Sequence, residues 1–596
     1  MANIFTGIVS KYRIFGRAFG DYTKATVVLI ALGFLGGLFE GIGANSIIPL
    51  FSILTNKTAD GQQDTITRFL AQAFDFFHLE FSLASLLVLI VGLFVLRSIT
   101  LVVSSLIKIQ ITTKYEKDIR VRLLKAFIKA DWPFLIDQKL GHLETLLLTN
   151  VRNASLVLEH FCMVFVTVAS LLVYLVVAFN ISATITLLTM GVGAVVFIFF
   201  KPLLGGSKKF SYNIEIINKQ IAHFLNESIY GLKTIKIMHV GATISKLGDK
   251  YFESLRKESV KIAMLRSVGD ALLQPIGVIF ICVLFAISYK ATAFQIGSFA
   301  AVIYLVQRIF IFLQQALASM RAINEYSPYL TAILRMEEDV AKSKEEDGGK
   351  DAFSFGRSLE FKNVSFGYQA EKLILDGVSF EVKKGETVGL IGPSGAGKTT
   401  VVDLCLRLFK PNEGVVAIDG KDVKTIKLEE WRDNIGYVSQ DIFLMNDTIE
   451  ANIRFYDEDV TEADMVEAAK KANIHEFIES LPNKYATVIG ERGVLLSAGQ
   501  RQRIIIARIL ARSPQILILD EATSALDNES EMQIQEVMEN LKGKITVLII
   551  AHRLTTIMHA DRLMVLEGGK IIEEGRPDEL LANKDSYFHK VSNIRK

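Results

Sequence analysis

One segment of the chain has residue types in an order that suits phosphate binding. Three glycines lie in the run Gly392-Pro-Ser-Gly-Ala-Gly-Lys-Thr399, which follows the apolar stretch 387–391 and precedes a stretch typical of a helix. Glycines let backbone N–H groups curve around a phosphate, Lys398 can neutralise its oxygens, and the Thr399 hydroxyl can bind Mg²⁺. The predicted phosphate site comprises Gly392, Pro393, Ser394, Gly395, Ala396, Gly397, Lys398, Thr399 and Thr400.

Two adjacent acids, Asp520 and Glu521, end a second apolar run that begins at Ile516. A carboxylate at the end of a buried strand can hold Mg²⁺, and its neighbour can polarise an attacking water as a general base. On its own, such a pair is more often a strand end followed by a solvated turn. The phosphate loop upstream favours the interpretation of Asp520 as a metal residue and Glu521 as the general base.

A third motif, Leu496-Ser-Ala-Gly-Gln500 followed by Arg501-Gln-Arg503, resembles the signature sequence of ATP-binding cassette (ABC) proteins. A helix that begins here would direct backbone N–H groups near Ser497 and Gly499 toward an anion. The sequence departs from the family pattern at Ala498, where glycine is frequent, but a methyl group removes no N–H donor. The resemblance runs through residues 358–590 and implies an α/β P-loop domain that hydrolyses ATP with Mg²⁺.

The resemblance also implies roles for residues outside these motifs. Tyr368 would stack on adenine, Gln440 would reach Mg²⁺, and His552 would contact the γ-phosphate. Asp527 would belong to the nucleotide-binding loop 524–527. Ser497, Gly499 and Gln500 would serve the ATP held by a second subunit, so that two ATP molecules lie between two chains. Because Glu521 and the signature are both intact, the resemblance favours a homodimer of two identical chains.

The N-terminal half contains six apolar runs long enough to cross a bilayer, whose hydrocarbon core requires about 20 residues of helix. They lie near residues 25–51, 82–107, 155–179, 182–200, 268–289 and 295–320, the third and fourth joined by a turn at Asn180-Ile181. Lys and Arg gather in the intervening segments 108–154 and 201–267, which places these segments and both chain termini in the cytoplasm. We expect both segments to extend the membrane helices, with breaks at Trp132–Leu140 and Met238–Ala242 that can hold short contact helices.

These patterns predict a membrane α-helical bundle of the ABC exporter type followed by an α/β P-loop nucleotide-binding domain. The expected parts are an N-terminal amphipathic segment at the cytoplasmic interface (1–24), a six-span domain (25–335), a charged linker (336–357) and the nucleotide-binding domain (358–596). A net charge of +2 argues against a nucleic-acid partner, and the spans make membrane lipids the surroundings. A bacterial inner membrane is the expected location.

Polar residues inside membrane spans are costly and are candidates for function. Here they are Glu40, Asn45, Arg97, Gln274, Gln307 and Arg308. Glu40 and Arg97 could form a structural pair, or the arginines could bind the anionic head of an amphiphile. The layout is similar to that of flippases for lipid-linked saccharides, whereas multidrug, peptide and lipid A exporters share the same frame. A cassette that regulates a channel or sensor is the alternative from another class, and the intact Glu521 counts against it.

Overall fold

The computed structural model describes residues 16, 18–46, 49–50, 65–76, 78–288, 296–369, 372–520, 527–550 and 557–594. The chain folds as two compact units. The first comprises Met1–Ala130 and Phe134–Lys344, and the second comprises Asp131–Pro133 and Glu345–Lys596.

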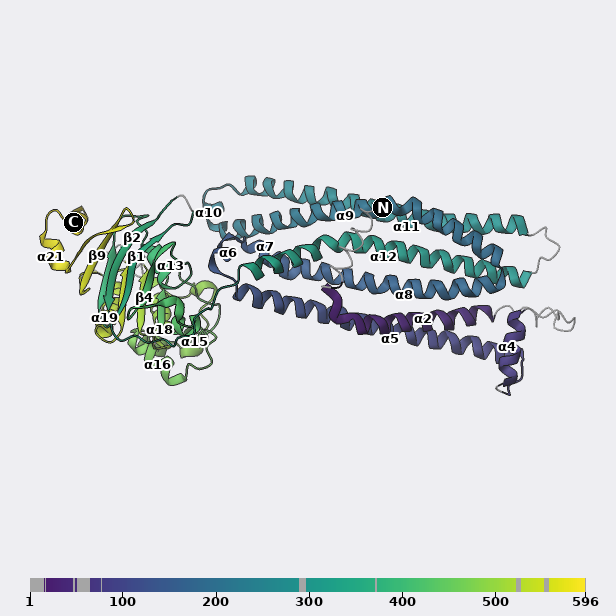
Figure 1. The fold of residues 1–596 in the computed structure, drawn as a ribbon, viewed down its shortest axis with the longest axis horizontal. Helices are drawn as coiled ribbons and strands as arrows, with labels where there is room; N and C mark the ends of the chain where they lie inside the picture. The colour runs from purple at the N-terminus through teal and green to yellow at the C-terminus, as the bar shows by residue number, and fades with distance from the viewer. Residues whose placement is uncertain are drawn as a thin grey trace. The chain divides into compact units, whose positions relative to one another are not determined.

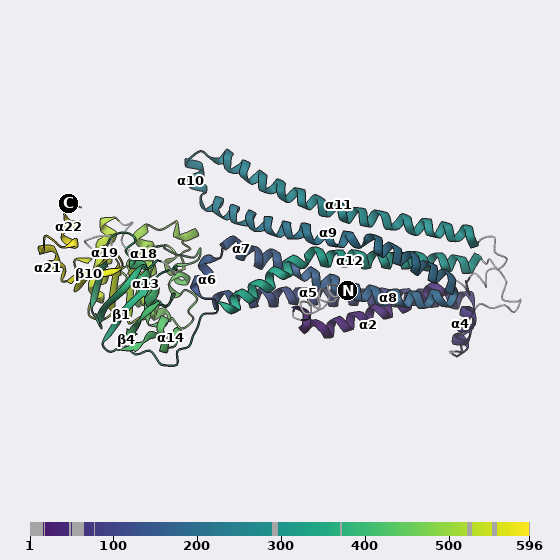
Figure 2. The same cartoon turned by 45° about the horizontal axis from the view of Figure 1, so that its top comes forward.

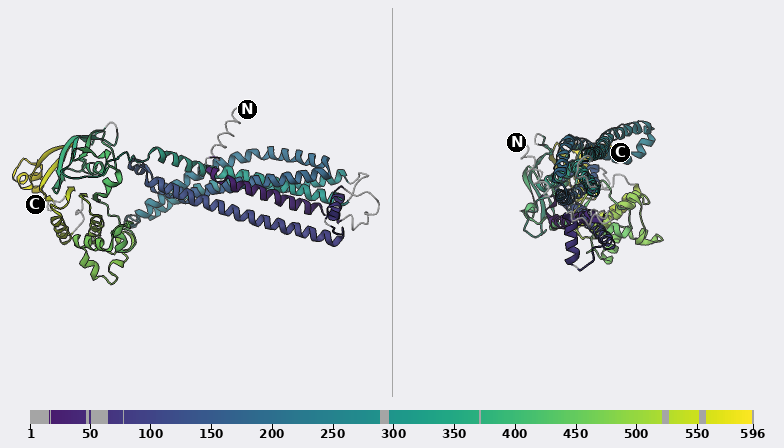
Figure 3. Two further views of the ribbon diagram at one scale, coloured as in Figure 1. Left: turned by 60° about the horizontal axis from the view of Figure 1, so that its bottom comes forward. Right: turned by 90° about the vertical axis from the view of Figure 1, so that its right-hand side faces the viewer.

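The first unit is a bundle of long helices that run side by side (Figures 1 and 3). Its elements are η1 (Gly20–Tyr22), α2 (Thr23–Asn45), α4 (Thr65–Phe76), α5 (Leu83–Ile128), α6 (Trp132–Asp137, whose first two residues group with the second unit), α7 (Leu140–Thr145), η3 (Leu146–Asn150), α8 (Val151–Ile181), α9 (Ala183–Tyr230), α10 (Leu232–Ile237), α11 (Gly241–Ser288) and α12 (Ile296–Lys342). Among the described residues, six helices are long and apolar enough to cross a membrane, which confirms the predicted number of apolar spans.

Four of these helices are far longer than a bilayer requires. α5 has 46 residues, α9 and α11 have 48 each, and α12 has 47. The predicted helical stretches 115–129 and 214–230 are therefore continuous with the spans before them, as expected. The short helix α6 occupies the first predicted break. The short helix α10 ends at Ile237, just before the second predicted break at Met238–Ala242. It stops there because His239, inside that break, has a left-handed backbone (φ 55°).

The junction between the third and fourth spans is at Ser182, and the prediction of a turn at Asn180-Ile181 was wrong. Asn180 and Ile181 still belong to α8, and Ser182 alone is extended, with φ −153° and ψ 104°. The Ser182 hydroxyl accepts a hydrogen bond from the Ile185 N–H at 3.4 Å, which caps the start of α9. A single capping residue is therefore enough to separate the two helices.

The described end of the predicted N-terminal amphipathic segment packs inside the bundle. Phe19, which we expected at the membrane interface, is only 6% exposed, and its ring lies 5.3 Å from that of Tyr115 and 6.4 Å from that of Phe161. Residues 1–15 and 17, which carry the rest of that prediction, lie outside the described residues. The aromatic contacts show why this end is buried: Phe19 fills space between α5 and α8.

The second unit is built on two sheets. A six-stranded sheet has the order β10-β9-β3-β8-β7-β6, and a four-stranded antiparallel sheet has the order β2-β1-β4-β5. The strands are β1 (Ser358–Phe366), β2 (Leu375–Lys383), β3 (Thr387–Ile391), β4 (Glu413–Ile418), β5 (Lys421–Asp422), β6 (Ile435–Val438), β7 (Ile516–Asp520), β8 (Thr546–Ile550), β9 (Arg562–Glu567) and β10 (Lys570–Gly575). Strands β9 through β6 pair in parallel, which confirms the predicted α/β class.

Helices cover this unit (Figure 2). They are α13 (Lys398–Cys405), α14 (Leu428–Asp433), α15 (Ile449–Arg454), α16 (Glu462–Lys471), α17 (His475–Ser480), α18 (Ala498–Leu510), α19 (Asn528–Leu541), α21 (Pro577–Ala582) and α22 (Tyr587–Ile594), with short 3-10 turns η4 (Val423–Thr425), η5 (Lys484–Ala486) and η6 (Glu491–Gly493). β3, β7 and β8 are buried along their whole length, so the core of the unit lies around the parallel strands whose ends carry the predicted chemistry.

Candidate nucleotide site and intramembrane ion cluster

The phosphate loop connects β3 to α13 and needs glycine at two positions for steric reasons. Gly392 and Gly397 have φ of 155° and 104°, a region that disfavours side chains. A Cβ at Gly392 would lie 2.0 Å from the Leu566 carbonyl oxygen, and one at Gly397 would lie 2.8 Å from the Leu375 side chain. The loop is thereby wrapped closely over β9, with the N-terminus of α13 at its end.

Lys398 is 6% exposed, and its ammonium donates hydrogen bonds to the carbonyl oxygens of Gly392 and Pro393 at 2.9 and 3.0 Å. The side chain thus folds back over the loop. Together with the positive end of α13, this places positive charge at the loop that joins β3 to α13. The arrangement can hold a polyphosphate.

Tyr368 lies beside this loop. Its hydroxyl is 3.2 Å from the Thr400 hydroxyl and donates a hydrogen bond of 3.2 Å to Asp403. Burial raises the pKa of the Asp403 carboxyl, and the hydrogen bond from Tyr368 opposes that shift. Because Tyr368 remains 53% exposed, its ring is available to stack on a planar base.

Asp520 ends β7 at the same edge of the sheet as the phosphate loop. In the parallel register, Asp520 pairs with Ile550 of β8, and Ile550 pairs with Leu390 of β3. Asp520 is 4% exposed and accepts a hydrogen bond of 3.5 Å from the Tyr437 hydroxyl. Gln440 follows β6 at this edge and is exposed. Glu521 and His552 lie outside the described residues.

The signature sequence forms the N-terminus of α18, as predicted. The exposed Ser497 accepts a hydrogen bond from the Gln500 N–H at 3.2 Å, and the Gln500 side chain accepts one from the Ser497 N–H at 2.9 Å. This reciprocal cap fixes the first turn of the helix. Asp527 caps the start of α19 by accepting a hydrogen bond from the Ser530 N–H at 3.5 Å.

Gly499 has a second reason to be glycine, which the sequence reasoning missed. It is buried, and a Cβ there would lie 2.2 Å from the Ser530 hydroxyl oxygen. The start of α18 therefore packs directly against the start of α19, with no space for a methyl group. Sequence spacing carried no signal of this contact.

In the membrane unit, Glu40 of α2 lies at the centre of an ion cluster. Its carboxylate is 2.8 Å from the Arg97 Nε of α5 and 2.7 Å from the Arg308 Nη2 of α12. Tyr304 donates a hydrogen bond of 3.2 Å to Glu40 and accepts one of 3.1 Å from Arg308. Glu40 is 2% exposed, whereas the two arginine side chains are 23% and 26% exposed. The predicted pair Glu40–Arg97 is present, and Arg308 joins it.

The remaining polar candidates are not part of this cluster. Asn45 is buried at the C-terminal end of α2, and its Oδ1 has no hydrogen-bond partner among the described residues. Gln307 is exposed on α12, although it is the neighbour of Arg308. The cluster residue that the sequence reasoning missed is Tyr304, and the signal was its position four residues before Arg308, which places both on one helix face.

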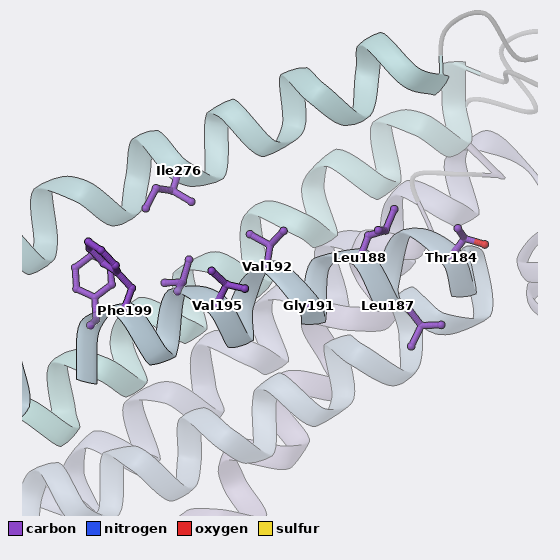
Figure 4. A pocket seen from close by; sticks show the side chains of 10 residues that line it. Thr184, Leu187, Leu188, Gly191, Val192, Val195, Phe199 and Ile276 are labelled. Carbon is purple, nitrogen blue, oxygen red and sulfur yellow. The ribbon is translucent and has the colours of Figure 1, made fainter. Parts of the chain in front are cut away.

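An apolar cavity of about 820 Å³ lies between α9 and α11 of the same unit. Figure 4 shows Val192 and Val195 of α9 and Ile276 of α11 at the space between the two helices. The lining residues are Thr184, Leu187, Leu188, Gly191, Val192, Val195, Val196, Phe199, Phe200 and Ile276. A cavity with a single polar residue at its wall suits hydrocarbon.

The fold and the two sites define the class of protein. The sequence profile of the ABC transporter transmembrane region matches residues 27–316, and the profile of the ABC transporter matches residues 375–524. The chain therefore belongs to the ABC transporter family, as an exporter half-transporter with its membrane domain and its ATPase in one polypeptide. It is a multi-pass integral membrane protein, and it binds and hydrolyses ATP in a reaction coupled to transport.

Proteins similar to this chain include named exporters and flippases. The chain is 32% identical over 482 residues to a candidate multidrug export ATP-binding/permease protein of Bacillus subtilis, across 79% of this chain and 82% of that protein. It is 32% identical over 530 residues to the ATP-dependent lipid A-core flippase of Haemophilus influenzae, across 84% and 86% of the two chains. A bacterial Atm1-family ABC exporter with ATP bound matches 97% of the chain with a TM-score of 0.79 and 23% identity, which shows the fold. A half-transporter of this fold works as a dimer in a membrane.

Proposed function

We propose that two identical copies of this chain form an ATP-driven exporter or flippase. By alternating access, it moves an amphiphile with an anionic head, such as a lipid-linked saccharide, from the cytoplasmic side of the membrane. The observation that carries the proposal is the Glu40 cluster: two guanidinium groups face one carboxylate inside an apolar bundle. Its charge sums to +1, and an uncompensated charge inside a membrane domain calls for an anionic partner.

The geometry of the cluster divides its residues by role. Both carboxylate oxygens of Glu40 already have arginine partners, so Glu40 orients Arg97 and Arg308 and is itself closed to substrate. A guanidinium has five N–H donors in a planar fork, so each arginine keeps donors for a phosphate or pyrophosphate oxygen. The apolar cavity in the same unit supplies walls that suit the hydrocarbon part of the molecule.

In the nucleotide site, Lys398 and the phosphate-loop N–H groups would hold the β- and γ-phosphates of ATP, and Tyr368 would stack on adenine. Thr399 and Asp520 offer the hard oxygen donors that Mg²⁺ prefers, at one edge of the sheet, and Gln440 adds an amide oxygen. When bound, Mg²⁺ would neutralise charge on the transferred phosphoryl group. Glu521 would take the proton of the attacking water, and His552 would contact the γ-phosphate.

The second copy would complete each site. Ser497 and Gly499 present the N-terminus of α18, which suits the γ-phosphate of ATP held by the partner. Because this chain retains Glu521 and its signature, both sites of such a dimer would be competent. The basic segments 108–154 and 201–267 support a cytoplasmic location of both termini in a bacterial inner membrane.

Transport activity tests the proposal most directly. The chain, purified alone and reconstituted in proteoliposomes, is expected to show ATPase activity that a lipid-linked oligosaccharide stimulates more than a cationic drug does. R97A and R308A should each lose most of that stimulation, because each removes a donor fork for the anionic head. R256Q, which removes an exposed arginine paired with Glu253, is the matched control and should keep it.

Lipid A precursors also carry phosphate on a lipid anchor. The same ATPase assay with lipid A precursors in place of the lipid-linked oligosaccharide therefore shows which of these two anionic lipids stimulates the protein more. Stimulation by the cationic drug that survives in R97A and R308A would instead favour the multidrug alternative and contradict the proposal. Glu521→Gln should nearly abolish turnover. A passive conductance without vectorial movement of lipid would support the alternative of a regulated channel.

A further inference from the structure

Arg508 lies on α18, beyond the signature turn, and reaches across to the segment that follows Gln440. Its Nε donates a hydrogen bond of 2.7 Å to the Asn452 carbonyl oxygen, and its Nη1 donates one of 3.0 Å to the Phe443 carbonyl oxygen. Its Nη2 donates a third, of 3.1 Å, to the Asn452 side-chain oxygen. Burial lowers the pKa of this arginine to about 10, so it stays charged at neutral pH. Hydrogen bonds from a charged, half-buried donor are among the strong ones.

The segment that Arg508 holds is irregular. Phe455 and Tyr456 both have left-handed backbones, with φ of 45° and 63°, which are uncommon for aromatic residues. The guanidinium carbon of Arg508 lies 4.3 Å from the centre of the Phe455 ring, over its face. A strained turn of this kind persists only where its surroundings fix it, and Arg508 is one of the groups that do so.

Asn452 transmits this restraint toward Gln440. It is fully buried, accepts a hydrogen bond of 2.9 Å from the Met445 N–H and donates one of 3.1 Å to the Met445 carbonyl oxygen. Arg508 therefore fixes Phe443 directly and Met445 through Asn452. Gln440 precedes Phe443 by a short stretch of chain that begins at the end of β6, so both ends of that stretch are anchored.

We propose that Arg508 is a positioning residue for ATP hydrolysis: it sets the Gln440 segment relative to the signature helix α18. The inference rests on the roles proposed above for Gln440 and Ser497. α18 then has two roles. Its N-terminus offers Ser497 to the partner's ATP, and Arg508 on its side restrains the Gln440 segment, which reaches the chain's own Mg²⁺. Closure of one nucleotide site is thereby coupled to the geometry of the other.

The test measures ATPase kinetics of the full-length dimer with Mg·ATP. Arg508→Lys keeps the charge but can replace only part of the three-bond fork, and we expect kcat to fall about ten-fold. The KM for ATP should change less than about two-fold, because Arg508 contacts neither Tyr368 nor the phosphate loop in the hydrogen bonds described. Arg512→Lys is the matched control: Arg512 lies just beyond the end of α18, pairs with Asp457 at 3.1 Å, and should leave kcat unchanged.

A double-mutant cycle separates positioning from a general loss of structure. In a Gln440→Ala background, Arg508→Lys should lower kcat by less than about two-fold, because the residue that it positions is gone. An equal loss in both backgrounds, or a rise in KM that parallels a fall in melting temperature, would overturn the inference. Arg508→Gln provides a second substitution if the lysine variant does not fold. If Gln440→Ala alone keeps full turnover, the proposed role of Gln440 fails instead, which is a separate result.

Discussion

At the scale of single residues, Gly499 shows how one position can meet two demands. The proposed contact with a partner's γ-phosphate needs a free N–H, which alanine would also supply. The packing against Ser530 needs the absence of a Cβ, since that atom would lie 2.2 Å from the Ser530 oxygen and 2.5 Å from its Cβ. The second demand is the stricter one, because overlap at these distances forces α18 and α19 apart.

Gly499→Ala is therefore expected to lower ATPase activity by more than about ten-fold, because the shift moves the first turn of α18. Ser530→Gly removes both close atoms and leaves only the Ser530 Cα, at 3.6 Å. The double variant should recover most of the activity, while Ser530→Gly alone should remain near that of the unmodified protein. The measurement is the ATPase rate of the three purified variants. A double variant as inactive as Gly499→Ala would show that packing is not the reason for glycine.

The residue scale also separates what the sequence could reveal from what it could not. Lys398 and Asp520 were predictable, because the phosphate loop and the strand that ends in an acid are local patterns with a fixed chemical meaning. The contact of Arg308 with Glu40 was not, because these residues are far apart in the chain and the helices that carry them can pack in many ways. Polarity within a span indicated that each residue mattered, but only the packed bundle pairs them.

At the scale of elements, α2 and α8 pack closely through glycines spaced four residues apart. A Cβ at Gly33 would lie 2.8 Å from the Val166 side chain. One at Gly37 would lie 3.2 Å from the Cα atom of Ser170, which follows Val166 by four residues on α8. The Ser170 hydroxyl donates a hydrogen bond of 3.2 Å to the Gly33 carbonyl oxygen. Small residues at this spacing are what lets two membrane helices approach at backbone distance.

Gly37→Leu should lower the thermal unfolding midpoint of the reconstituted protein by several degrees, since overpacking of this kind costs about 1–3 kcal/mol. Gly92→Leu on α5 is the matched control, because it makes the same substitution at a position where nothing lies within 4 Å of a Cβ. The measurement is thermal unfolding in lipid nanodiscs. Equal shifts in the two variants would mean that the close approach of α2 and α8 contributes little to stability.

Elements differ in how far their sequences predict them. The spans and the strands β3, β7 and β8 are continuous apolar runs, so their positions follow from length and burial. The antiparallel strand β2 contains Gly377 and alternates in burial, and irregularities interrupt its register with β1 twice. The junction at Ser182 and the stop at His239 depend on one capping contact and one left-handed residue, which leave little trace in composition.

At the scale of the whole molecule, the proposed dimer predicts how damaged chains complement one another. If the signature serves the partner's ATP, a Lys398→Ala chain paired with a Ser497→Ala chain retains one intact site, built from the undamaged phosphate loop of one and the undamaged signature of the other. A chain with both substitutions paired with an unmodified chain retains none.

Mixed dimers purified through two different affinity tags test this prediction. We expect the first pairing to keep roughly half of the ATPase activity or less, and the second to keep almost none, because the double variant damages both sites. A signature that served its own chain would reverse the two results. Dimers of the unmodified chain that carry both tags provide the reference rate.

The length of the bundle helices has a mechanical consequence. At 46 residues, α5 is about 70 Å long, more than twice the thickness of a hydrocarbon core of about 30 Å. A rigid rod held near the middle of the bilayer magnifies small rotations, so a tilt of about 10° displaces an end about 45 Å away by about 8 Å. The helix ends farthest from the Glu40 cluster can thus complete a large stroke while the cluster moves little. The substrate site proposed there would then change its access without being dismantled at every turnover.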